Sequence, residues 1–355
     1  MRKRTKVILV LLLPVQILVL QLLKKFPEFV ENYYSQGLYP ILSKLPRYLF
    51  GWIPFSIGDI FYTLIAIIAL RWLYKNFRRL RLEPVAFVVD IVASVSLVYF
   101  VFHLLWGFNY YRVPLHTTLQ LDRDYTTEQL IVMTERFIEK SNTLHTELGF
   151  ADSVKIDLPY TQQEIFQRSL NGYQTVAKTY PNLKYTPRSI KKSTWSLGLT
   201  YMGYSGYFNP FSGEAQVNRK IKSYKFPVVS CHEIAHQLGY AAENEANFIA
   251  TLTSIHNSDP YIRYTGYIFA LRYLINEVAR RDRDTYNQLI ETINPGILKS
   301  YKEMRDFWAS YENPFEDISK AFWNQFLKAS NQPKGIMSYS YMVALVINHF
   351  EGQEL

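Results

Sequence analysis

Three long apolar stretches within residues 1–115 constrain the fold of this chain more than any other feature. They cover about residues 7–23, 52–70 and 85–106, and few polar side chains interrupt them. About 20 apolar residues match the thickness of a bilayer. The first stretch follows a basic start, as in a signal peptide, but no small-residue cleavage site comes after it. We therefore expect three transmembrane helices in a membrane domain, residues 1–106, and a second domain, residues 107–355.

The basic residues beside these stretches predict which way the chain crosses the membrane. One cluster, "MRKRTK", precedes the first stretch, and a second lies at residues 71–81 between the second and third. Basic flanks favour the cytoplasmic side, so both clusters are expected there. The loop over residues 24–51 and the whole of residues 107–355 are then extracytoplasmic. The net charge of +9 comes partly from these clusters, and it indicates membrane orientation rather than nucleic-acid binding.

Three polar residues near or inside apolar sequence are expected to be structural. Asp59 and Asp90 lie toward the ends of their apolar stretches, where a carboxylate is tolerated, so no proton relay is expected. Cys231 is the only cysteine, which excludes an internal disulfide. On a helix its side chain is rotated about 100° from that of the next residue, so we expect a buried apolar position rather than a thiolate ligand.

The remainder of the chain reads as a mainly helical, α+β domain. Amphipathic periodicity predicts helices over residues 126–148 and 160–180, and Asp259-Pro260 is a good start for a helix reaching about residue 280. Residues 189–218 are rich in Ser, Thr, Tyr and Gly, which predicts short strands joined by tight turns. The expected fold is therefore three transmembrane helices followed by a helical domain with a small sheet.

The sequence "KFPVVSCHEIAHQLGY" contains the strongest chemical signal. Pro227 suits the first turn of a helix and Gly239 suits the position after its end. His232 and His236 are then i and i+4 on one helical face, where both imidazoles reach one ion. Glu233 lies beside them, in the place of the general base of zinc hydrolases.

A third ligand is expected from the helix that follows Gly239. A hydrolytic zinc site uses three protein ligands and an open position for water. "ENEAN" offers Glu243 and Glu245, whose side chains lie about 200° apart around a helix, so only one of them can join the histidines. We favour Glu243, with Glu245 as the alternative. Asn247 lies one turn after Glu243 and is placed to orient a histidine.

The motif "HEIAH" followed by "ENEANFIA" resembles the gluzincin zinc metallopeptidases. The pattern E-x-x-A-N/D is similar in membrane-embedded prenyl-protein proteases and in antitoxin-degrading, immunity-repressor-type peptidases. In those families the first Glu is the third ligand, which corresponds to Glu243 here, and the Asn or Asp corresponds to Asn247. This chain has a much shorter gap between histidines and glutamate than the prenyl proteases, so their substrates are not carried over.

A wider resemblance covers nearly the whole chain. "WGFNYYR", "PFSGEAQVN" and "GIMSYS" are similar to segments of a bacterial membrane family catalogued as domain of unknown function 3810. This resemblance implies a zincin-like extracytoplasmic domain on the bacterial inner membrane, but no substrate.

Together these features predict a zinc peptidase, with one Zn²⁺ per chain, acting on a peptide or protein of the cell envelope. An extended substrate would pair with an edge strand before the metal helix. A stabiliser for the oxyanion is expected from Tyr339, Tyr341 or His349. The alternative is a non-catalytic zincin-like module that binds envelope components and holds a structural metal or none. The residues expected in the substrate strand are Glu214, Ala215, Gln216, Val217 and Asn218; alternatively they form a hairpin that only supports the helix.

Overall fold

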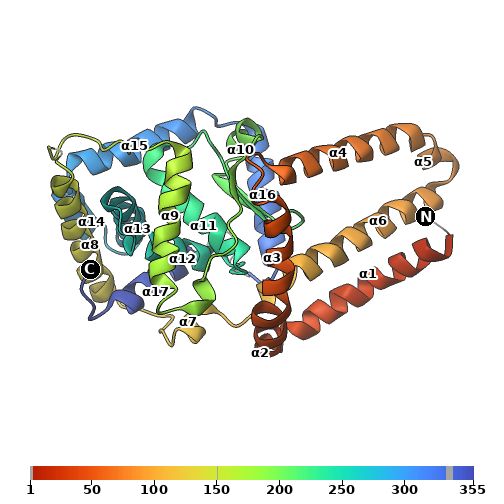
Figure 1. Ribbon diagram of the computed structural model, residues 1–355, viewed down its shortest axis with the longest axis horizontal. Helices are drawn as coiled ribbons and strands as arrows, with labels where there is room; N and C mark the ends of the chain where they lie inside the picture. Colours follow the sequence, from red (N-terminus) through yellow and green to blue (C-terminus); the bar gives the residue numbers. More distant parts are fainter. Residues whose placement is uncertain (1–2, 150, 333–338) are drawn as a thin grey trace.

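The computed structural model describes residues 3–149, 151–332 and 339–355, and three long helices project from one side of a helical domain (Figure 1). These are α1 (Lys3–Leu23), α4 (Ile57–Asn76) and α6 (Pro84–Leu105). All three are long and apolar enough to cross a membrane. They agree with the predicted stretches, although α4 begins and ends several residues later than expected.

The ends of these helices that lie away from the helical domain carry the basic clusters. Lys6 of α1 and Arg79 of α5 (Arg79–Leu82) both form ion pairs with Asp90 of α6. The Arg79 Nη1–Asp90 Oδ2 distance is 3.1 Å. The chain start and the α4–α6 connection therefore lie together at the end remote from the helical domain, as the charge pattern predicts.

Residues 27–50, expected to be a loop, are helical instead. They form α2 (Pro27–Phe29), a wide π-helical segment η1 (Val30–Leu38) and α3 (Tyr39–Phe50). The Tyr39 hydroxyl donates to the carbonyl of Gln237 at 2.8 Å. Tyr34 and Tyr39 form an apolar cluster with Trp106 and Tyr110. The segment is ordered because its aromatic side chains pack against the helical domain, a contact that local sequence pattern does not reveal.

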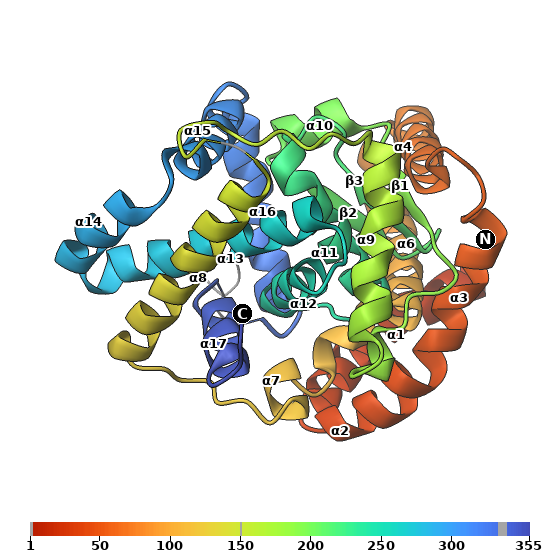
Figure 2. The same cartoon turned by 60° about the vertical axis from the view of Figure 1, so that its left-hand side comes forward.

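The helical domain is built around three consecutive helices. These are α11 (Phe226–Gln237), α12 (Glu243–Ile255) and α13 (Pro260–Arg281), with α8, α9 and α17 packed around them (Figure 2). The carboxylate of Asp259 accepts from the first backbone amides of α13, as predicted. Buried side chains such as Ile234, Phe248 and Tyr264 fill the core. The other elements are η2 (Gly107–Tyr111), α7 (Leu115–Thr118), α8 (Thr127–Glu147), α9 (Gln162–Val176), η3 (Pro181–Leu183), α10 (Ser196–Tyr201), η4 (Ser223–Lys225), α14 (Arg283–Thr292), α15 (Pro295–Ala309), α16 (Pro314–Ala329) and α17 (Tyr339–Phe350).

A small sheet lies between α11 and the start of α4. It contains β1 (Ile190–Lys192), β2 (Gly206–Asn209) and β3 (Glu214–Val217), in the order β1-β3-β2. β3 pairs in parallel with β1 and antiparallel with β2. Buried Asp59 of α4 accepts from the Thr194 amide at 2.6 Å and from the Tyr207 hydroxyl. Asp59 therefore joins α4 to the sheet, which agrees with a structural role.

Candidate metal centre

The two histidines of the HExxH motif lie on one face of α11. Pro227 occupies the first turn of this helix, where its missing amide is not needed. Gly239 follows the helix end with φ +93°, a conformation that favours glycine. The chain reverses there, so α12 runs back against α11. The ring centroids of His232 and His236 are 4.5 Å apart.

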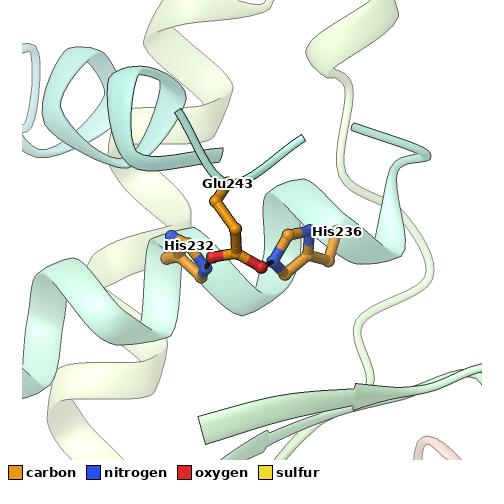
Figure 3. Close-up of side chains that lie close together, drawn as sticks. All are labelled: His232, His236 and Glu243. Atoms are coloured by element: carbon orange, nitrogen blue, oxygen red, sulfur yellow. Dashed lines mark ion pairs between the residues drawn. The ribbon is translucent and has the colours of Figure 1, made fainter. Parts of the chain in front are cut away.

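Glu243, the first residue of α12, brings its carboxylate between the two imidazoles (Figure 3). Its Oε2 lies 3.4 Å from His232 Nε2, and its Oε1 lies 3.5 Å from His236 Nε2. One ligand atom from each of the three residues can be chosen so that all lie within 4.8 Å of one another. The sequence-predicted trio is therefore assembled in space.

The other ring nitrogens of the histidines are held by acceptors. His232 Nδ1 lies 3.0 Å from Asn247 Oδ1, and His236 Nδ1 lies 2.8 Å from the carbonyl of Tyr240. A carbonyl oxygen only accepts, so each Nδ1 carries a hydrogen, and each Nε2, which faces Glu243, is the ring atom left to bind a metal. The Trp106 indole donates to the His236 carbonyl at 2.8 Å, which ties the helix end to α6. Asn247 thus has the orienting position that the sequence predicted.

This donor set fits Zn²⁺. Zinc binds imidazole nitrogen and carboxylate oxygen at about 2.0–2.2 Å in a tetrahedron, whose ligand atoms are then about 3.3 Å apart. Each Nε2 lies near that distance, at 3.4 and 3.5 Å, from one oxygen of the Glu243 carboxylate, and the oxygen is a different one for each histidine. Orientation of both Nε2 lone pairs by hydrogen-bonded Nδ1 atoms is the usual arrangement around a zinc ligand. His232, His236 and Glu243 could therefore hold the ion with little rearrangement.

The charges of the trio attract one another strongly. Burial by itself would raise the pKa of Glu243, but the imidazoles, His236 foremost, hold that pKa well below its ordinary value. Burial would lower the pKa of His236, yet the Glu243 carboxylate raises it to about 9. Burial lowers the pKa of His232, and His236 lowers it further. The site therefore favours a positive charge beside the ionised Glu243 carboxylate. A bound dication would also provide that positive charge.

Glu233 lies next to the trio in a dry position. Its side chain is buried, and its Oε2 has no hydrogen-bond partner within the described part of the chain. Burial is the main reason that its pKa is raised to about 8. A methyl group added to Gly206 of β2 would lie only 2.6 Å from Glu233 Oε1, so the edge strand passes close to this carboxyl. An unpartnered buried acid beside a backbone edge is suited to proton transfer.

Glu245, the alternative ligand, does not join the histidines. Its Oε1 accepts from the backbone amide of Leu115 at 2.7 Å, on the other side of α12. Burial raises its pKa to about 7, although the Leu115 amide and Arg112 oppose that shift. Because α12 already begins at Glu243, the helix places the two carboxylates on different faces. Glu245 therefore links α12 to the start of α7.

A family model described as "Protein of unknown function (DUF3810)" matches residues 34–347. The chain belongs to this family. The matched region begins within η1 and ends within α17, so it includes α4, α6 and the metal-site helices together. Searches of curated proteins and of solved structures returned no match.

The expected substrate strand of this DUF3810 chain needs correction. β3, which contains Glu214 to Val217, is the central strand, and both of its edges are already paired. Asn218 also donates its amide to the carbonyl of Ser205. A peptide cannot add to a strand that has no free edge. The edge strand beside the metal site is β2; proximity in sequence to the metal helix favoured β3, whereas the pairing fits the alternative of a hairpin that supports the helix.

Two of the three expected oxyanion stabilisers, His349 and Tyr341, do not line the cavity of the trio. His349 is buried against Phe248, with ring centroids 5.3 Å apart. Tyr341 lies under the guanidinium of Arg123, 4.8 Å from ring centroid to Cζ, and lines a different cavity. The side chain of Tyr339 lies outside the described residues.

One cavity of the DUF3810 chain is lined by His232, His236 and Glu243. Other polar residues, which sequence reasoning missed, line the same cavity. Lys225 ends the turn before α11, and its Nζ donates to Ser205 Oγ at 3.2 Å. Burial lowers the pKa of Lys225 to about 8. Tyr204 also lines the cavity, and its hydroxyl bonds to Ser319 of α16. Lys225 carried a weak signal, a lysine immediately before the buried metal helix, whereas Tyr204 was one tyrosine among 28.

Proposed function

We propose that this protein is a membrane-anchored zinc-dependent peptidase whose catalytic domain lies outside the cytoplasm. The assembled trio carries the proposal: two imidazole Nε2 atoms, oriented by Asn247 and the Tyr240 carbonyl, face the Glu243 carboxylate. The neighbouring Glu233 is buried and unpartnered, as a general base needs. Three apolar helices with both basic clusters at the remote end support an inner-membrane anchor with this domain outside.

The residues of the site divide into holding, proton-transfer and substrate-binding roles. His232, His236 and Glu243 would hold Zn²⁺, which would supply Lewis-acid activation of water by lowering its pKa toward neutral. Glu233 accepts the proton of the attacking water and later donates it to the leaving amine. A neighbouring dication favours the carboxylate form of Glu233, which is the form that accepts a proton.

The backbone of β2 binds the substrate in this proposal. β2 is the edge strand, and both Gly206 and Tyr207 line the cavity that contains the trio. An extended peptide that pairs with this edge would pass beside Glu233, because Gly206 approaches that carboxyl so closely. Gly206 thus offers its backbone groups for pairing with the peptide, and its lack of a side chain leaves room for the carboxyl of Glu233.

The substitution Glu233→Gln tests this function. It removes the proton acceptor but no ligand, so we expect about one zinc per chain and a loss of peptide hydrolysis of about 10²–10⁴-fold. Metal content would be measured by mass spectrometry of detergent-purified protein, and hydrolysis with a peptide library. Glu291→Gln, the same change at an exposed position of α14, should alter neither.

Two results would contradict the proposal. Zinc-loaded Glu233→Gln protein that hydrolyses peptides at the wild-type rate would remove Glu233 from the mechanism. Wild-type protein that holds zinc but hydrolyses no peptide in the library would favour the non-catalytic module.

A further inference from the structure

The cavity that holds the metal trio has walls from the membrane helices as well as from the helical domain. Its volume is about 630 Å³. Tyr62 of α4, Phe102 of α6 and Trp106, just after α6, form part of its lining. Phe322, Trp323 and Phe326 of α16 form another part. The lining therefore combines the polar residues of the trio and Glu233 with a mostly aromatic wall, which makes the cavity amphipathic.

The cavity lies where α4 and α6 are separated. At the remote ends of these helices Trp72 and Phe87 stack, with ring centroids 5.3 Å apart. At the ends nearest the helical domain, the cavity lies between Tyr62 and Phe102. Figure 1 shows the two helices joined through α5 at one end and apart at the other. The space next to the helical domain is thus bounded by the two transmembrane segments. Its Tyr and Trp side chains lie at the depth that these residue types occupy at a bilayer interface.

Helix α16 runs across the domain-facing ends of these segments (Figure 1). Its inner side packs on α6 and on the lining of the site: Phe326 lies 6.0 Å from Phe102, and Trp323 lies 6.1 Å from Tyr204, between ring centroids. Three large apolar side chains of α16 are exposed instead. They are Phe315 at 56%, Ile318 at 66% and Phe322 at 72% exposure.

The bilayer is the occupant that best explains this exposed face. Phe315, Ile318 and Phe322 are spaced i, i+3 and i+7, as on the apolar stripe of an interfacial helix. Another exposed aromatic side chain lies at the domain-facing end of α4. Trp195, beside α10, is 38% exposed and donates from Nε1 to Thr63 of α4 at 3.1 Å. Because Trp195 bonds to α4, the exposed rim formed by Phe315, Ile318, Phe322 and Trp195 lies beside a span, and the boundary between headgroups and acyl chains is the apolar surface within its reach.

We infer that the substrate is itself anchored in the bilayer and reaches the site laterally, between α4 and α6 and beneath α16. This inference rests on the proposed function and names its substrate class: a polypeptide with an apolar anchor, followed by an extended segment that pairs with β2. The cut falls just outside the membrane. Either a transmembrane helix or an acyl chain provides the anchor, since both place peptide at that depth.

The first experiment asks whether α16 lies in the bilayer, and it needs no catalysis. A nitroxide spin label is attached at Ile318→Cys in full-length protein in liposomes, with Val132→Cys on α8, 55% exposed, as the matched control. Cys231 is fully buried and stays unlabelled. We expect high oxygen and low nickel-chelate accessibility at position 318 and the reverse at position 132. Equal nickel-chelate accessibility at both positions would overturn the inference.

The second experiment reads binding rather than hydrolysis. A photo-reactive benzoylphenylalanine replaces Phe322 in zinc-loaded Glu233→Gln protein in liposomes. The probes are one random peptide pool in three forms: soluble, acylated, and fused to a transmembrane helix. At least one anchored form should cross-link about tenfold more than the soluble form. The form that cross-links more identifies the anchor.

Two matched variants decide whether the rim guides the substrate. Ile318→Glu should remove the advantage of the anchored pool, while Val132→Glu should preserve it. Soluble peptides that cross-link as well as anchored ones would overturn the inference, whether or not the protein hydrolyses them. If wild-type protein fails to hydrolyse any pool while anchored peptides still cross-link, the proposed function fails and the lateral site stands.

Discussion

At the scale of single residues, the site depends on which side of α12 a carboxylate occupies. Glu243 and Glu245 are both glutamates of the first turn, yet one faces two imidazoles and the other accepts from the Leu115 amide. Glu243 is expected to bind the metal, and Glu245 is expected to anchor the start of α7. These two roles predict opposite effects of the same substitution.

Glu243→Ala should abolish zinc binding, because two histidines alone leave the ion without its third protein ligand. Glu245→Ala should keep the zinc but lower the free energy of unfolding by about 1–3 kcal/mol, because the buried Leu115 amide loses its acceptor. Metal content and thermal unfolding of the two detergent-purified variants distinguish the roles. Zinc lost from Glu245→Ala and kept in Glu243→Ala would reverse the assignment.

The protonation of His236 and Glu233 predicts how the stabilisation of the protein by zinc varies with pH. Without metal, the folded protein holds protons on His236, with its pKa raised from 6.5 to about 9, and on Glu233, raised from 4.5 to about 8. The unfolded chain releases both at lower pH, so the stability that these two groups contribute to the metal-free protein is lost as pH rises from about 5 to 9. Zinc displaces protons, so its stabilising effect should grow over the same range.

This dependence is measured as the rise in melting temperature on adding zinc at pH 6, 7 and 8.5. We expect the rise to increase with pH in the wild type and to be absent in Glu243→Ala. A zinc effect of constant size across this range would show that no proton is displaced from the site.

At the scale of elements, the turn between α11 and α12 brings the third ligand back. Gly239 has φ +93°, and an added methyl group would lie 2.9 Å from the ring of Tyr39 and 3.0 Å from Asn109 Oδ1. Gly239→Ala should therefore destabilise the protein by about 1–3 kcal/mol and weaken zinc binding, since the turn cannot keep its shape. Chemical unfolding and zinc titration measure the two effects.

Gly198→Ala is the matched control for this substitution. Gly198 lies in α10, has no positive φ, and nothing lies within 4 Å of an added methyl group. The same change there should raise the free energy of unfolding slightly, by up to about 1 kcal/mol, and leave zinc affinity unaltered. Equal losses in both variants would show that the effect does not arise from the turn.

The elements that sequence predicted well are those whose signals are local. The spacing of His232, His236 and Glu243 follows from helix geometry, and Gly239 marks the reversal, so the trio could be found without a structure. The same holds for the three apolar helices and for the Asp259 cap. In each case a few neighbouring residues carry the whole signal.

The features that sequence missed depend on distant contacts. Which of two hairpin strands is the edge depends on β1, a separate strand that pairs with β3 at Ala215 through Ile190. The helical nature of residues 27–50 depends on packing against Gln237 and Trp106. Pattern within a short window contains neither contact, so neither could be predicted from one sequence.

At the scale of the whole molecule, the membrane-proximal segment and the site form one packed unit. The Arg112 guanidinium donates to Glu31 Oε1 at 2.6 Å and to the carbonyl of Gly239 at 3.1 Å. It also lies over the ring of Tyr240, whose carbonyl orients His236. A buried ion pair therefore connects η1 to the turn that positions the metal ligands.

Glu31→Gln should consequently affect the metal site, although residue 31 is distant from that site in the sequence. It leaves the buried Arg112 charge unpaired, which is expected to destabilise the protein by about 3–5 kcal/mol. Asp306→Asn, which breaks the exposed Lys302–Asp306 pair of α15, should change stability by at most about 1 kcal/mol. Denaturant unfolding in detergent compares the variants, and zinc retention is followed along the same titration.

The fragment 107–355, which lacks Glu31 altogether, should then fail to keep its zinc under conditions where the full chain retains it. A fragment that binds zinc as tightly as the full chain would show that the helical domain builds its site independently of the membrane-proximal helices.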